Sequence, residues 1–175
     1  PVTTIAWRVC HLTIGLAMRG DYTAGSRSLT FEAVDVPGSA AEGLEGAFRP
    51  HHFGGVATVC CKLFSQVTPD IAIFGQKDYQ QLCVLLQMVR DLNLPLKIAG
   101  APTRREKDGL AMSSRNAYLT PAEREFAPRL YAALSELAER IAGGADIVSS
   151  VASTKLKIKS AGFQKIDYVE VRDAG

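Results

Sequence analysis

The spacing of apolar residues predicts a strand, a helix and a second strand in the middle of the chain. In DYQQLCVLLQMVRDLN (78–93) apolar positions recur at helical spacing, and one face carries Leu82, Leu85, Val89 and Leu92. The short apolar segments DIAIFG (70–75) and LKIAG (96–100) flank this helix and are typical of buried strands. Two strands joined through a helix predict a β–α–β unit with parallel strands.

Helical spacing also occurs on both sides of this unit. A helix is predicted from His52 to just before Pro69, on the apolar positions Val56, Val59, Cys60, Leu63, Phe64 and Val67. Another is predicted to open at Pro121, a favourable first-turn residue, and to end at Gly143. Its buried face is predicted to consist of Phe126, Leu130, Ala133, Leu134, Leu137 and Ile141. A weaker helix is predicted over 147–160.

Strand-like segments occur towards both ends of the chain. SLTFEAVDV (28–36) alternates apolar and polar positions and stops at Pro37, while KIDYVEV (165–171) predicts a last strand. Between the first of these and the helix at His52, residues 39–48 favour a short helix that Gly43 and Gly46 weaken. Residues 1–24 show no clean period and predict no element.

This order of elements predicts an α/β fold with its polar chemistry at one edge. Right-handed crossovers bring the carboxyl ends of parallel strands to the same edge, where ligands bind in such sheets. Two polar clusters directly follow a predicted strand: GQKDYQQ (75–81) and TRREKDGLAMSSRN (103–116). We therefore expect both clusters at the same edge of the sheet.

Composition narrows the class of protein. The chain has 175 residues, 47% apolar and 22% charged, as in ordinary globular domains, and its net charge of +2 gives no support to a nucleic-acid binder. No apolar run reaches the roughly 18 residues that a membrane span needs. The four cysteines, Cys10, Cys60, Cys61 and Cys83, form no C-x-x-C pair, so zinc and disulfides are not expected. Buried thiols of a cytosolic protein are the expectation.

The first polar cluster suits an anion. Gly75 permits close approach to the backbone, Lys77 supplies a compact positive charge, and the start of the following helix favours an anion. Gln81 lies one turn after Lys77 and can face the same site, while Asp78 stands where a helix N-cap belongs. The alternative is an ordinary strand-to-helix turn with a capping aspartate and a solvated lysine.

The second cluster also suits phosphate oxygens. Ser113, Ser114 and Arg115 offer hydroxyls, backbone amides and a planar fork of donors, Gly109 adds flexibility, and Met112 can pack on a flat ring. The alternative is a serine-rich loop with an incidental arginine. Neither a P-loop nor a G-x-G-x-x-G sequence occurs, so a basic loop and a helix end would bind the phosphates instead.

RPHHF (49–53) is a third candidate. Arg49 is a plausible anion clamp, and paired histidines can suggest a metal or a general base. No carboxylate or cysteine stands at ligand spacing, so no metal site is expected. The simpler interpretation is that one histidine caps the following helix.

Four segments, LEGAFRPHHFGGVATV, KLFSQVTPDIAIFGQKDYQQL, MVRDLNLP and REKDGLAMSSRNAYLTPAER, resemble in order the pantoate–β-alanine ligase family, as does IDYVEVRD near the end. The resemblance covers about residues 25–175. It implies a nucleotidylyltransferase-type fold, with residues 25–105 in a Rossmann-like parallel sheet. Residues 106–175 would then form the second ATP loop and the start of a smaller α+β domain. Residues 1–24 have no counterpart.

The resemblance also implies a reaction and partners. Members of this family condense pantoate with β-alanine using ATP and Mg²⁺. ATP converts the pantoate carboxylate to pantoyl adenylate and releases pyrophosphate. The β-alanine amine then attacks the mixed anhydride, which gives pantothenate and AMP. The enzymes are typically cytoplasmic homodimers without nucleic-acid or membrane partners.

Site residues follow from the same resemblance. Gln81 matches a glutamine that binds pantoate. The positions that match ATP contacts are Arg49, Gly75, Gln76, Lys77, Asp78, Arg104, Met112, Ser113, Ser114 and Arg115. The chain departs from the family at His51 and Gly54, at Gln76, where the family has glutamate, and at Arg104, where an apolar residue is usual.

One family motif has no match. The PTMGxLHxGH block, whose histidines stabilise the adenylation transition state, does not occur in the 175 residues, so no catalytic residue is matched. We therefore expect a fragment of the enzyme. The alternative is a non-catalytic fragment that keeps part of a nucleotide-binding surface. In either case these residues alone are expected to bind ATP weakly and to form no pantothenate.

Overall fold

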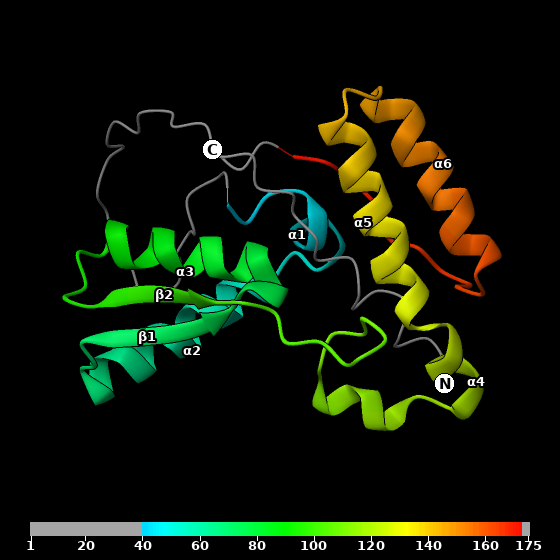
Figure 1. The fold of residues 1–175 in the computed structure, drawn as a ribbon. Helices are drawn as coiled ribbons and strands as arrows, with labels where there is room; N and C mark the ends of the chain where they lie inside the picture. Colours follow the sequence, from blue (N-terminus) through cyan, green and yellow to red (C-terminus); the bar gives the residue numbers. More distant parts are fainter. Residues whose placement is uncertain (1–39, 173–175) are drawn as a thin grey trace. The chain divides into compact units, whose positions relative to one another are not determined.

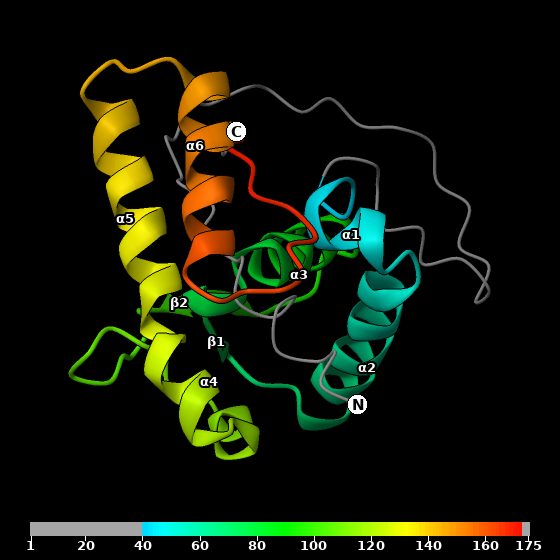
Figure 2. The same ribbon diagram turned by 90° about the vertical axis from the view of Figure 1, so that its right-hand side faces the viewer.

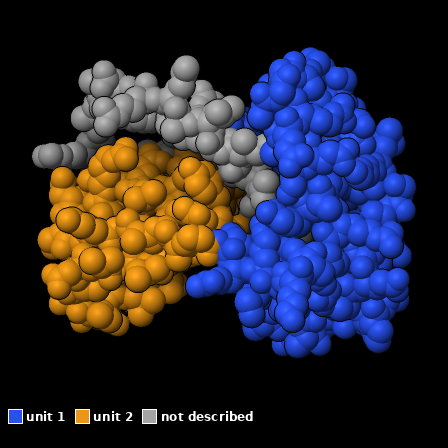
Figure 3. Space-filling view, in the orientation of Figure 1, with its two compact units in different colours: residues 1–17, 103–174 blue, residues 18–102, 175 orange. Residues whose placement is uncertain are grey.

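The computed structural model of the chain describes residues 40–172, and Figures 1 and 2 show their elements in two views. The described chain divides into two compact units, residues 40–102 and residues 103–172, coloured separately in Figure 3. The predicted strand at 28–36 and the unassigned residues 1–24 lie outside the described residues. The predicted domain limits at 25–105 and 106–175 stay a prediction.

The 40–102 unit contains the predicted β–α–β arrangement. Its elements are helices α1 (Leu44–Phe48) and α2 (His52–Val67), strand β1 (Ile71–Gly75), a 3₁₀ turn (Gln76–Asp78), helix α3 (Tyr79–Asp91) and strand β2 (Lys97–Ala101). The two strands pair in parallel, with Ile71 opposite Lys97 and Gly75 opposite Ala101. Helix α3, which connects them, runs along the strand pair in Figures 1 and 2. The predicted α/β class is confirmed.

One face of this small sheet is covered. Ala57 and Phe64 of α2 pack with Leu85 and Met88 of α3, and partly buried strand residues Ala72, Phe74 and Ile98 complete the cluster. Ile71 and Ile73 alternate with these strand residues and are exposed. The apolar residues of α2 are not all buried either, since Val59, Leu63 and Val67 are exposed. The helices therefore fix the sheet from one side, with the turn after β1 at its end.

The cysteine expectation needs correction. Cys60, Cys61 and Cys83 are free thiols but only half-buried, and Cys60 and Cys61 lie at the margin of this cluster. Desolvation raises the pKa of the Cys60 and Cys83 thiols, which keeps both protonated and unreactive at neutral pH. Cys10 lies outside the described residues.

The 103–172 unit is mainly helical. A 3₁₀ turn (Ser114–Tyr118) precedes α4 (Pro121–Phe126), α5 (Pro128–Ala142) and α6 (Ile147–Ser160). The single helix predicted from Pro121 is thus two helices, because Pro128 lacks the N–H that would continue α4 and is the first residue of α5. Helix α6 has the predicted bounds and is capped by Asp146, whose carboxylate accepts a hydrogen bond from the Ser149 N–H (2.8 Å).

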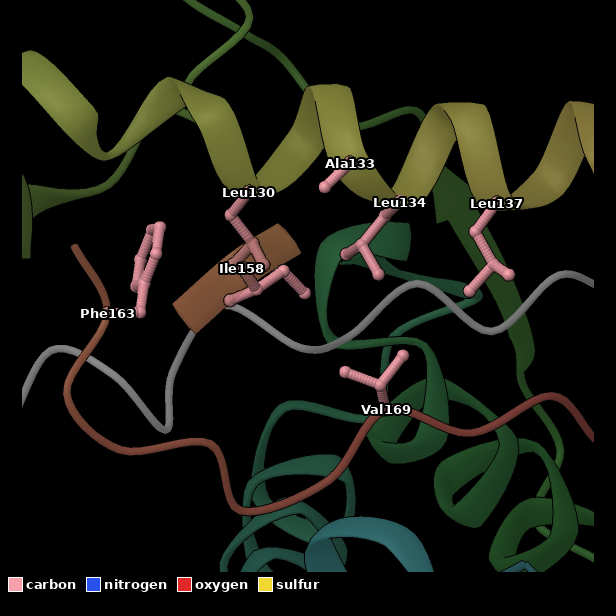
Figure 4. Close-up of a cluster of buried hydrophobic side chains, with 7 residues drawn as sticks. All are labelled: Leu130, Ala133, Leu134, Leu137, Ile158, Phe163 and Val169. Atoms are coloured by element: carbon pink, nitrogen blue, oxygen red, sulfur yellow. The ribbon is translucent and has the colours of Figure 1, made fainter. Parts of the chain in front are cut away.

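The core of this unit lies between α5, α6 and the segment that follows. Figure 4 shows Leu130, Ala133, Leu134 and Leu137 of α5 directed towards Ile158 of α6, with Phe163 and Val169 closing the cluster. The predicted buried face of the helix is confirmed, with Phe126 and Ile141 partly buried at its ends. The two compact units thus have separate apolar cores.

The strand predicted at 165–171 is wrong. These residues form no strand, because no described strand lies beside them to accept their backbone hydrogen bonds. The neighbours Tyr168 and Val169 are both buried, which differs from the one-sided burial of a strand with one face in water. Packing against the α5–α6 core, rather than strand pairing, accounts for Val169 and Ile166 of this segment.

The start of α4 supplies a stability prediction. The Thr120 hydroxyl accepts a hydrogen bond from the Glu123 N–H (3.3 Å), and the Glu123 carboxylate accepts one from the Thr120 N–H (2.8 Å). Thr120→Ala removes one half of this capping box and is expected to lower the free energy of unfolding by about 1 kcal/mol in urea titration. Ser153→Ala, at an exposed hydroxyl of α6, is the control and is expected to stay within about 0.5 kcal/mol. An equal loss in both variants would contradict the cap.

Candidate functional site

The first predicted ATP loop is the turn between β1 and α3. Gly75 ends the strand, and Gln76, Lys77 and Asp78 form a single 3₁₀ turn before α3 begins at Tyr79. The Lys77 ammonium donates to the Asp78 carboxylate over 2.9 Å, and both side chains are partly exposed. An ion pair at the surface contributes little stability, so an anion can compete with Asp78 for Lys77.

The predicted capping role of Asp78 is wrong. Asp78 precedes α3, but its side chain makes no capping hydrogen bond. The 3₁₀ turn changes the direction of the chain before the helix, and the carboxylate faces the Lys77 ammonium instead of the helix N–H groups. Asp78 therefore moderates the charge of Lys77.

Gln76 lies over the neighbouring strand. A Cβ placed on Gly100 of β2 would approach the Gln76 Cγ and Nε2 atoms to 3.3 Å, and the Leu82 side chain to 3.0 Å. Glycine at position 100 thus leaves the space that the Gln76 side chain occupies. The turn after β1 and the end of β2 meet at this point, as the parallel arrangement predicts.

Arg49 lies at the junction of α1 and α2. Its guanidinium donates to the carboxylate of Glu45 over 3.1 Å, and the side chain of Glu45 is only 4% exposed while that of Arg49 is 43% exposed. The backbone continues the link, since the Arg49 N–H donates to the Glu45 carbonyl and the His52 N–H to the Arg49 carbonyl, each over 2.9 Å. The Glu45 carboxylate thus fixes one side of the Arg49 guanidinium, while the side chain as a whole is partly exposed.

His52 connects this junction with the turn after β1. Its pKa is lowered, first by desolvation and then by the positive charge of Arg49, while the carboxylates of Glu45 and Asp78 act on it in the opposite direction. His52 is therefore neutral at pH 7. The RPHHF and KDYQQ motifs lie near each other, because Gln80 accepts a hydrogen bond from the Glu45 N–H and Glu45 binds Arg49. His51 precedes α2 without a side-chain capping bond, so the predicted histidine cap is wrong.

The two glutamines of KDYQQ differ in their surroundings. Gln81, the predicted pantoate contact, is half-buried on α3. Gln80, which the sequence analysis did not select, is buried and bonded to the segment before α1. Its position offered a signal, because Gln80 stands four residues before Val84 and eight before Met88, both buried on the same helix row.

The second predicted ATP loop belongs to the 103–172 unit and is held by a tight turn. Arg105 and Ala111 pair as an antiparallel bridge, and the Met112 N–H donates to the Arg104 carbonyl over 2.9 Å. Gly109 has a φ of 93°, and a Cβ there would lie 3.0 Å from the Tyr131 ring. Only glycine combines this backbone conformation with so close an approach.

Arg105 and Asp108 fasten the same turn. The Arg105 guanidinium lies 3.5 Å from the centre of the Tyr131 ring and donates to the Gly109 carbonyl over 3.1 Å. The Arg124 guanidinium donates to Asp108 over 2.5 Å; this bond and a second from the Leu110 N–H lower the pKa of the Asp108 carboxyl. Arg105 was not selected from the sequence, since only the fold brings Tyr131 of α5 to it.

The serines and arginine follow directly. The Ser113 hydroxyl accepts a hydrogen bond from the Arg115 N–H over 3.2 Å at the start of the 3₁₀ turn, so its own proton remains able to donate. Asn116 donates from its side chain to the Ala111 carbonyl over 3.0 Å and ties the loop to the turn. Ser114, Arg115 and Met112 are exposed, as is Arg104. The loop thus presents hydroxyl and guanidinium donors on a fixed backbone.

The predicted site residues therefore fall into two groups. Arg49, Gly75, Gln76, Lys77, Asp78 and Gln81 belong to the 40–102 unit, and Arg104, Met112, Ser113, Ser114 and Arg115 to the 103–172 unit. Within residues 40–172, no group of three or more histidine, cysteine or acidic side chains could hold a metal ion. None of the helices in this part of the chain combines the length and apolarity that crossing a bilayer requires. Each group offers donors for anionic oxygens.

Comparison with known proteins agrees with this chemistry. The family described as pantoate-beta-alanine ligase matches residues 20–175. A pantothenate synthetase of Bradyrhizobium sp. is 56% identical over 137 residues, which are 78% of this chain and 48% of that protein. The chain spans about half the length of the curated relatives it matches.

Solved structures give the same result. The crystal structure of pantothenate synthetase from Thermus thermophilus is 46% identical and superimposes with a TM-score of 0.72, over 77% of this chain and 49% of that one. The ligase of Francisella tularensis, complexed with β-γ ATP and β-alanine, is 37% identical with a TM-score of 0.59, over 70% and 44% of the two chains.

Proposed function

Since the chain belongs to the pantoate–β-alanine ligase family, we propose that it supplies part of the site at which pantoate and β-alanine are condensed at the expense of ATP. The observation that carries this proposal is the cluster around the turn after β1. It combines the Lys77 ammonium, the Arg49 guanidinium held by Glu45, and a neutral His52 on which the charges of Arg49 and Asp78 act. Such a cluster is suited to a polyphosphate.

The proposed roles follow the development of charge. In the first step a pantoate carboxylate oxygen bonds to the α-phosphorus of ATP while the bond to pyrophosphate breaks, so negative charge grows on the leaving group. Lys77 and Arg49 are assigned to those phosphate oxygens, where fixed positive charge stabilises the transition state. Gln81 is assigned to pantoate. In the second step the β-alanine amine displaces AMP and loses a proton.

The second loop is assigned to the same nucleotide. Ser113 retains a hydroxyl proton to donate, and Ser114 and Arg115 are exposed donors beside it. Met112 is assigned to the adenine ring, as an exposed and polarisable side chain. Arg104 is assigned to adenine through its backbone. Its carbonyl already accepts a hydrogen bond from the Met112 N–H, so the contact would use other backbone groups of this segment.

Magnesium is assigned to the nucleotide and not to a site of its own. The described residues hold no group of three candidate metal ligands, and the one carboxylate in the first loop, Asp78, is paired with Lys77. Mg²⁺ would then arrive bound to the ATP phosphates, which is its usual mode with nucleotides. A cytoplasmic homodimer is proposed on the family resemblance alone.

The alternative is a chain that binds nucleotide without catalysis, which its coverage of about half of its relatives keeps open. Calorimetry with Mg-ATP on the 175-residue chain tests the site. An AMP-release assay with pantoate and β-alanine separates the two hypotheses when it is run on a ligase of the relatives' full length that carries these residues, because these residues alone are expected to form no pantothenate. AMP release that requires both substrates would establish the ligase. ATP binding without AMP release would favour the binding role, and no ATP binding at all would contradict the proposed site.

Arg115→Lys provides a specific test of the second loop. Lysine keeps the charge but not the planar fork, so a bidentate phosphate contact is lost. We expect ATP affinity to fall about tenfold or more, as for one charge-assisted hydrogen bond, with the unfolding midpoint unchanged because Arg115 is exposed. Arg129→Lys, at an exposed arginine of α5, is the matched control. Full ATP affinity in Arg115→Lys would remove the phosphate role.

A further inference from the structure

Gln80 makes an unusual set of hydrogen bonds for a side chain on an amphipathic helix. Its amide oxygen accepts from the Glu45 N–H over 3.1 Å. Its amide nitrogen lies within hydrogen-bond distance of three carbonyls, those of Ala40 (3.1 Å), Glu42 (3.3 Å) and Gly43 (3.3 Å). One buried side chain of α3 thus binds a segment 35 to 40 residues earlier in the chain.

The backbone conformation of that segment explains why the carbonyls converge. Gly43 and Leu44 both have positive φ, 67° and 46°, immediately before α1. For a leucine this conformation costs of the order of 1–3 kcal/mol, so the surroundings must hold it. The segment also folds tightly onto α1, since a Cβ on Gly46 would lie 1.8 Å from the Ala41 carbonyl oxygen. Gln80 supplies the interactions that stabilise this turn.

The turn leads directly to Arg49. The Glu45 N–H donates a hydrogen bond to the Gln80 amide oxygen, and the buried Glu45 carboxylate accepts one from the Arg49 guanidinium. Because the Glu45 carboxylate is buried and its backbone is fixed, it gives the Arg49 guanidinium a fixed partner. A mobile Glu45 would allow the Arg49 side chain to adopt more rotamers. The position of Arg49 thus depends on Glu45, and that of Glu45 on Gln80.

We propose that Gln80 is a positioning residue, which braces the segment before α1 and, through Glu45, holds the Arg49 guanidinium in place to receive an anionic ligand. Only the identity of that ligand, the phosphates of ATP, rests on the proposed function. Gln80 touches no ligand itself. The two neighbouring glutamines of α3 would then have different roles: Gln81 would bind the substrate, and Gln80 would position Arg49, the residue assigned to the phosphates.

The first test is hydrogen exchange on the 175-residue chain. Gln80→Leu leaves three carbonyls and the Glu45 N–H without their buried partner. Peptides covering 40–49 are expected to exchange about tenfold faster or more, while those of β1 and β2 are unchanged. Gln66→Leu, the same change at an exposed glutamine of α2, is the control. If Gln80→Leu does not fold, Gln80→Glu keeps the acceptor for the Glu45 N–H but turns an oxygen towards the three carbonyls in place of the donor, and the same result is expected.

The second test asks whether Gln80 acts through Arg49. Mg-ATP affinity is measured by calorimetry for Arg49→Ala, Gln80→Leu and the double variant. We expect similar losses in both single variants and no further loss in the double variant, because the brace has no effect once Arg49 is absent. A purely structural role would instead weaken the double variant further.

Two outcomes would overturn the proposal: unchanged exchange over 40–49 in Gln80→Leu, or additive losses of ATP affinity. Absence of ATP binding by the unmodified chain is a different result. It would contradict the proposed function, while the exchange measurement would still decide whether Gln80 braces the segment that carries Arg49.

Discussion

Lys77→Ala is expected to lower the rate of pantoyl adenylate formation by about 10²- to 10³-fold, in a ligase of the relatives' full length that carries these residues. Fixed positive charge placed where negative charge develops contributes about 3–4 kcal/mol to the transition state in comparable sites. The fold does not depend on Lys77, because its partner Asp78 is a partly exposed neighbour in the same turn. Pantoate-dependent exchange of pyrophosphate into ATP measures this step without the second substrate.

The control for this prediction is Lys62→Ala, which removes an exposed lysine from α2. Both variants lose one positive charge, so a general electrostatic effect would lower both rates equally. A near-normal exchange rate in Lys77→Ala would remove the lysine from the reaction and leave the turn after β1 with only a structural role.

Periodicity was sufficient for the elements whose burial is one-sided. The β–α–β unit follows from two short apolar segments and a helix with Leu82 and Leu85 on one face, and the parallel pairing follows from the connecting helix. Helix α6 has the predicted bounds because both ends carry local signals, an aspartate cap and a glycine soon after the last turn. In these cases local preference and packing favour the same structure.

The predictions that were wrong concern residues whose conformation is decided by tertiary contacts. KIDYVEV has a strand-like composition, but a strand also needs a neighbour, and here Val169 and Ile166 pack into the α5–α6 core without strand pairing. Asp78 has the residue type and place of a helix cap, but the preceding 3₁₀ turn directs it to Lys77. A sequence pattern identifies the residue types, but the path of the backbone, which decides what each side chain contacts, depends on the fold.

In the candidate site, too, some residues can be identified from the sequence and others only from the fold. The motif resemblance selects Lys77, Arg49 and Ser113 without any geometry, because those residue types are tied to phosphate chemistry. It does not select Gln80 or Glu45, whose contribution depends on a contact across 35 residues. Residues that touch a ligand are thus visible in a motif, whereas residues that position them become visible in the fold.

Leu85→Ala is expected to lower the free energy of unfolding of the 40–102 unit by about 2–5 kcal/mol. Leu85 is 0% exposed and packs with Ala57, Phe64 and Met88, so its truncation leaves a cavity in the core between α2, α3 and the strands. Urea titration measures the loss, and hydrogen exchange assigns it. Peptides of β1, β2 and α3 should exchange faster, while those of α5 and α6, whose core is separate, should not.

The adjacent residue provides the matched control for this prediction. Leu86 lies on the same helix but is 40% exposed, so Leu86→Ala removes the same atoms from a site that is largely in water. We expect a loss below about 1 kcal/mol for this variant. Equal losses in the two variants would mean that α3 does not present the face described here. Faster exchange of α5 and α6 in Leu85→Ala would mean that the two compact units unfold together, and that the support of the Lys77 turn extends beyond its own unit.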